Sequence, residues 1–234
     1  MDPERLVLLQ GLRDTRSTLT RWLENPRSVL VPWTLGALAI AIALLSVVWL
    51  IAASVQPDPS TTLLPGLNTH ADLGDVGRIL FRNSLVLALH AFACVAGFIA
   101  GASLPLQVEG KTGFSRLLHE HAGRYAILFV SVATLFSLAT QGYVLGRIGA
   151  DLSLQLAISP FKLILTLLPH AIPELVGLFL PLAAWLIASR RDEWEELLAA
   201  TFVTVALAIP LLVGAAFLEV YVWPDVLRMV SPIY

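Results

Sequence analysis

The sequence has few charged residues for its length. Only 14% of its 234 residues are Asp, Glu, Lys or Arg, whereas soluble domains carry about 25%. Hydrophobic residues make up 57%, more than a soluble fold of this size would bury. The net charge of -2 provides no basic surface for nucleic acid, and we expect no nucleic-acid partner. These proportions predict an integral membrane protein.

Cysteines and common catalytic motifs are also scarce. The single Cys94 excludes an internal disulfide, and its apolar surroundings predict a small buried residue. The sequence contains no HExxH, CxxC, GxSxG, P-loop or GxGxxG motif. The His119–Glu120–His121 cluster is interpreted as part of a solvated loop. We therefore expect no enzyme activity, no cofactor and no metal.

Long apolar runs, by contrast, are plentiful. Because a spanning helix needs about 20 apolar residues, we predict an all-α, polytopic transmembrane helix bundle with about five spanning helices. The predicted spans are 29–54, 79–104, 125–146, 171–189 and 198–222. Prolines interrupt the stretch before the fourth span, and residues 152–168 are expected to form a separate short helix, either re-entrant or interfacial. A sixth crossing through these residues is the alternative.

The first 28 residues differ in character from the remainder. Leu8, Leu12, Leu19 and Leu23 recur at helical spacing, which predicts an amphipathic surface helix over 3–24. A solvated charged leader is the alternative. The apolar run that follows is too long for a signal peptide. We thus divide the chain into a cytoplasmic leader, 1–28, and one transmembrane domain, 29–234.

The distribution of Lys and Arg predicts the orientation, because cytoplasmic segments are enriched in them. With five crossings and a cytoplasmic N-terminus, ten of the fifteen lie on the cytoplasmic side. We expect a multi-pass protein of the bacterial inner (cytoplasmic) membrane. The ten residues are Arg5, Arg13, Arg16, Arg21, Arg27, Lys111, Arg116, Arg124, Arg190 and Arg191.

Polar residues inside the spans are the functional candidates, because such residues are costly in lipid. They are Arg82, Asn83, His90, Gln141, His170, Glu174 and Glu219. Arg82 and Glu219 fall at similar depth, and we expect Arg82 to pair with Glu219 or Glu174. Structural clamps or snorkelling side chains are the alternative. Pro173 favours a helix that begins near His170, with Glu174 in its first turn.

Small residues mark candidate helix contacts. Gly97 and Gly101 form one GxxxG pattern, Gly142 and Gly146 form another, and Gly177 continues a small-residue face of the fourth span. Such patterns let helices approach closely. Packing within the chain is the favoured interpretation, and a homodimer is the alternative.

Several motifs in order resemble the stage II sporulation protein M family, over about residues 81–224. They are FRNS at 81–84, the glycine-rich second span, QGYVLG at 141–146, LLPHAIPELVG at 167–177 and FLEVYVWP at 217–224. The family typically has glycine where this chain has Ala171.

The resemblance implies a polytopic membrane protein with no established enzyme activity. Founding members act in a membrane complex with peptidoglycan-remodelling partners, and other relatives accompany bacteriocin export. The leading hypothesis is a non-catalytic subunit that organises or anchors a membrane complex, with cell-wall remodelling proteins among the candidate partners. The alternative is a permease-like exporter component that works with a separate ATPase. A third hypothesis is an intramembrane hydrolase that uses His170 and Glu174.

Overall fold

The computed structural model describes residues 3–100 and 122–234. These residues form helices and connecting segments, with a single isolated bridge between Pro65 and Thr69. The helices are α1 (Pro3–Glu24), α2 (Arg27–Ser54), α3 (Leu73–Phe98), α5 (Ala122–Gln155), α6 (Pro160–Arg191), η3 (Trp194–Glu196), α7 (Leu197–Phe217), η4 (Leu218–Val222) and α8 (Trp223–Val230).

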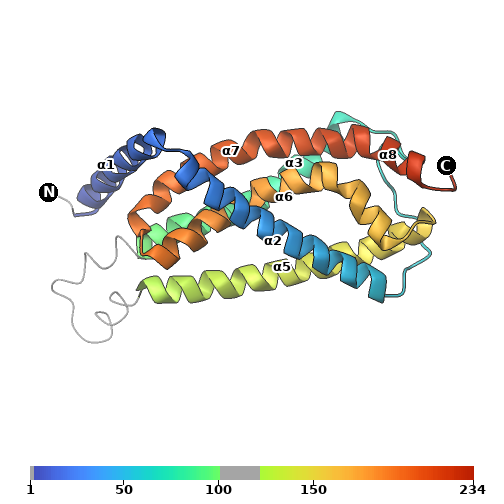
Figure 1. The fold of residues 1–234 in the computed structure, drawn as a ribbon, viewed down its shortest axis with the longest axis horizontal. Coiled ribbons are helices and arrows are strands. Elements are labelled where there is room, and N and C mark those ends of the chain that lie inside the picture. Colours follow the sequence, from blue (N-terminus) through green and yellow to red (C-terminus); the bar gives the residue numbers. More distant parts are fainter. Residues whose placement is uncertain (1–2, 101–121) are drawn as a thin grey trace.

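Five of the helical segments are long and apolar enough to cross a membrane, which confirms the expected number. They lie within α2, α3, α5, α6 and the continuous segment Trp194–Val230. Figure 1 shows them side by side along the long axis, with alternating directions. The all-α helix bundle predicted from the sequence is therefore confirmed.

The separate helix expected at residues 152–168 is wrong. Residues 152–155 end α5, a short turn follows, and α6 then runs without interruption to Arg191. Ser159 caps α6 by accepting a hydrogen bond from the backbone N–H of Lys162, and Pro160 occupies the first turn, where proline is favourable. Pro169, Pro173 and Pro181 lie inside the helix, and α6 bends along its length (Figure 1). His170 and Glu174 therefore lie mid-helix.

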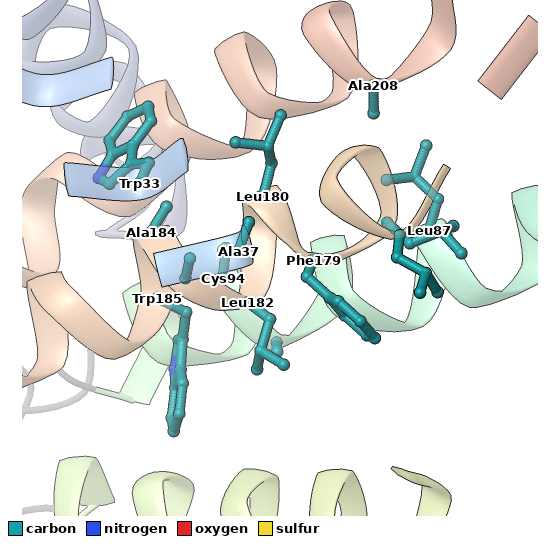
Figure 2. Packing of buried hydrophobic residues seen from close by; sticks show 14 of the residues in the cluster. Trp33, Ala37, Leu87, Cys94, Phe179, Leu180, Leu182, Ala184, Trp185 and Ala208 are labelled. Atoms are coloured by element: carbon teal, nitrogen blue, oxygen red, sulfur yellow. The ribbon is translucent and has the colours of Figure 1, made fainter. Parts of the chain in front are cut away.

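Helix α6 forms the centre of the bundle. Within the spanning windows, 56% of the α6 residues are buried, whereas only 11% of those in α5 are. Figure 2 shows Phe179, Leu180, Leu182, Ala184 and Trp185 of α6 among Trp33 and Ala37 of α2, Leu87 and Cys94 of α3, and Ala208 of α7.

Helix α5 stands at the edge of the bundle, along α2 (Figure 1). Gly142 and Gly146 provide the close approach: a Cβ on Gly142 would lie 3.0 Å from Cγ1 of Val47, and one on Gly146 would lie 2.6 Å from Cβ of Ile51. This is the geometry in which small residues bring two membrane helices together. About half of the other side chains along the α5 span, including Leu135 and Phe136, are exposed, as expected for a helix with one face toward lipid.

Candidate functional site

A cavity of about 370 Å³ lies between α3, α5, α6 and η4. Apolar side chains form much of its wall: Ile79, Val86, Val144, Leu145, Leu175 and Leu178. Six polar side chains also line it: Arg82, Asn83, Thr140, Gln141, Glu174 and Glu219. The cavity thus brings together five of the seven polar residues singled out from the sequence, from four segments of the chain.

The side of the cavity formed by α6 is closed, and the side between α3 and α5 is open. Leu175 and Leu178 of α6 are buried, whereas Arg82 on α3 and Val144 on α5 are exposed. The opening therefore lies between two membrane-spanning helices, on the face where lipid would contact the bundle.

The expected ion pair of Arg82 is not formed. Its neighbour Asn83 instead donates a hydrogen bond from Nδ2 to Oε1 of Glu174, at 2.9 Å. Arg82 interacts electrostatically with Glu174 and Glu219, but its side chain makes no hydrogen bond or ion pair with any described residue. The side chain of Glu219 likewise has no such partner among residues 3–100 and 122–234. Two opposite charges therefore face one cavity without direct contact.

Glu219 lies in a π-helical turn, which the sequence reasoning missed. The turn η4 covers Leu218–Val222 and joins α7 directly to α8. Such turns inside α-helices occur frequently at functional sites. The one sequence signal is Pro224, because proline lacks the N–H that would continue the α-helical pattern toward Val220.

The two intramembrane histidines do not line the cavity. His90 is buried, and its Nδ1 lies 2.8 Å from the carbonyl oxygen of Leu178, while Cys94 donates a hydrogen bond to the carbonyl oxygen of Pro181 at 3.1 Å. Both contacts fasten α3 to the backbone of α6. His170 is buried against the ring of Trp223, with 5.2 Å between the ring centroids. Both histidines thus contribute to helix packing.

The described residues offer no candidate metal site. No group of three or more His, Cys, Asp or Glu side chains in residues 3–100 and 122–234 could hold a metal ion. The His119–Glu120–His121 cluster lies outside the described residues.

Two further glycines of the predicted contact set also lie against other helices. A Cβ on Gly97 would lie 2.9 Å from Nε1 of Trp185, and one on Gly177 would lie 3.5 Å from the carbonyl oxygen of Ala208. The structure therefore places these two glycines, like Gly142 and Gly146, in contacts within the chain. Gly101, the remaining member, lies outside the described residues.

A second feature is the attachment of α1 at the opposite end of the bundle from α8 (Figure 1). Arg21 forms an ion pair with Glu196 at the start of the last span. Trp22 packs edge-on against Trp33 of α2, with 5.1 Å between ring centroids, and Thr18 is buried. The helix predicted at residues 3–24 is present, and these contacts fix its C-terminal half to the bundle.

Comparison with known families supports the resemblance seen in the sequence. The family model described as stage II sporulation protein M matches residues 122–224. The match includes QGYVLG, LLPHAIPELVG and FLEVYVWP, whereas FRNS at 81–84 and the second span lie outside it. No curated protein and no solved structure matches the chain.

Proposed function

We propose that this multi-pass membrane protein, which matches the stage II sporulation protein M family over residues 122–224, is a non-catalytic subunit that organises a membrane complex. The supporting observation is the way in which α1 is fixed at one end of the bundle. Arg21 and Trp22 hold the helix against η3 and α2, so that α1 can present a partner-binding surface in a defined position.

The charge at this end supports a partner in the cytoplasm. Arg16, Arg27, Arg190 and Arg191 are all exposed there, and the ten Lys and Arg residues assigned to the cytoplasmic side include all four. By the positive-inside tendency, this end faces the cytoplasm of a bacterial cell. Residues 1–28 then act as the partner-facing leader, and residues 29–234 form the membrane domain.

A permease-like role is the second candidate, and the polar cavity favours it. An exporter subunit needs a polar site between helices and a surface that couples to an ATPase, and α1 would supply that surface. The hydrolase hypothesis receives less support, because His170 packs against Trp223 and no third metal ligand joins His170 and Glu174 in the described part of the chain.

Native co-purification from membranes, followed by mass spectrometry, tests the proposal. Wall-remodelling proteins would support the organising role, and a co-purified ATPase would support the permease. The charge-reversal variant Glu196→Arg should detach α1 and release the partner, while Arg16→Gln removes an exposed charge of α1 and leaves the Arg21–Glu196 ion pair in place. Recovery of the same partner from Glu196→Arg, with α1 shown to be detached by faster hydrogen exchange, would contradict a role for fixed α1.

A further inference from the structure

The cavity combines three properties that the organising role does not use. It lies among membrane-spanning helices, it opens between α3 and α5, and it has unpartnered groups of both charges. A volume of about 370 Å³ falls within the range of about 300–1,000 Å³ that is typical of small-molecule sites. The question is therefore which ligand would complete its hydrogen bonds.

Arg82 offers a binding site for an acidic group of such a ligand. Its guanidinium presents several N–H donors in a planar fork that matches phosphate or carboxylate oxygens. Because this side chain has no hydrogen-bond partner among the described residues, those donors are available to the cavity. A guanidinium left unsatisfied among spanning helices would be costly.

Glu174 and Glu219 offer a binding site for a basic group of the same ligand. Asn83 occupies one oxygen of Glu174, and both oxygens of Glu219 lack a partner in residues 3–100 and 122–234. Both carboxyl groups line the cavity, so that their like charges would repel each other when both are ionised. An ammonium group, with three N–H donors, would satisfy both of them while offsetting their charge.

We infer that this cavity binds a zwitterion that carries a phosphate and a primary ammonium group, the chemistry of phosphoethanolamine. The phosphate contacts Arg82, and the ammonium contacts Glu174 and Glu219. The apolar walls and the opening between α3 and α5 fit a lipid that enters from the bilayer with its acyl chains outside. Free phosphoethanolamine from water carries the same two groups.

The experiment measures lipid binding to the full chain by native mass spectrometry in detergent. Phosphatidylethanolamine is compared with phosphatidylglycerol, which lacks the ammonium group, and with phosphatidylcholine, whose ammonium has no N–H. Wild type should prefer phosphatidylethanolamine, and Arg82→Gln should weaken its binding roughly tenfold or more, as expected for a lost charge-assisted hydrogen bond. Glu219→Gln should reduce the preference over phosphatidylglycerol.

Arg78→Gln is the matched control, since Arg78 lies one turn earlier on α3, is exposed and pairs with Asp75 outside the cavity. Where Arg82→Gln does not fold, Arg82→Lys keeps the charge but loses the fork and should bind less tightly. Competition by free phosphoethanolamine would support the same chemistry with a water-soluble source. Equal binding of the three lipids, or equal effects of Arg78→Gln and Arg82→Gln, would overturn the inference.

Discussion

Gly146 is the residue at which helix packing can be tested most directly. A Cβ at this position would lie 2.6 Å from both Cβ and Cγ2 of Ile51, and 3.1 Å from the carbonyl oxygen of Val48. These atoms belong to the framework of α2, since Cβ is attached to the backbone and the carbonyl is part of it. Alanine at position 146 can therefore be accommodated only if α5 moves away from α2.

The size of the effect follows from two opposing contributions. Overpacking a well-fitted contact costs about 1–3 kcal/mol, whereas alanine in place of glycine favours a helix by about 0.5–1 kcal/mol. We therefore expect Gly146→Ala to lower the free energy of unfolding by about 1–2 kcal/mol. The measurement is reversible unfolding in mixed detergent micelles, followed by tryptophan fluorescence.

Gly149 is the matched control on the same helix. A Cβ there would lie 3.5 Å from Cβ of Ala52, which is an ordinary contact, so that Gly149→Ala should leave stability unchanged or raise it by up to about 1 kcal/mol. Gly142→Ala should fall between the two, because its close neighbour is the Cγ1 methyl of Val47 at 3.0 Å. Equal stability of Gly146→Ala and Gly149→Ala would refute the close α2–α5 contact.

Two further predictions concern the cavity and the orientation. A hydrogen bond of 2.9 Å joins the side chains of Asn83 and Glu174 directly. A double-mutant cycle with Asn83→Ala and Glu174→Ala should therefore give a coupling free energy of about 0.6–1.7 kcal/mol, as hydrogen bonds between membrane helices do. Additive losses of stability would show that the bond is absent. Cysteine labelling from outside the cell, in a Cys94→Ala background, should modify Pro65→Cys and leave Lys111→Cys untouched, and the reverse pattern would contradict the cytoplasmic N-terminus.

Apolar length was sufficient to predict the five spans, because lipid requires each backbone polar group to be satisfied within a helix. Proline was a poorer guide at α6. In water, Pro169 and Pro173 would end or strongly destabilise a helix, and this reasoning led to a separate segment at 152–168. Membrane helices tolerate interior prolines, so that the start of α6 is set instead by Ser159 and Pro160.

The cavity could be predicted in part. Depth along the helices places Arg82 and Glu219 near one level, and the structure brings both, together with Glu174, to one cavity. The depth of a residue in the membrane does not tell toward which neighbouring helix its side chain points. Consecutive residues in a helix point about 100° apart, so that Arg82 and Asn83 cannot both face α6. Asn83 faces it and bonds Glu174, while Arg82 lines the same cavity and is exposed.

The packing of α5 against α2 also bears on the shape of the cavity, because α5 forms one of its walls. Gly142 and Gly146 let α5 approach α2 closely, and Thr140, Gln141, Val144 and Leu145 of the same helix line the cavity. A bulkier contact would have to shift α5 relative to α3 and change the width of the opening. We therefore expect Gly146→Ala to alter lipid binding at the cavity as well as stability, whereas Gly149→Ala should alter neither strongly. A Gly146→Ala protein that lost stability but bound phosphatidylethanolamine like wild type would show that the shape of the cavity does not depend on the α2–α5 contact.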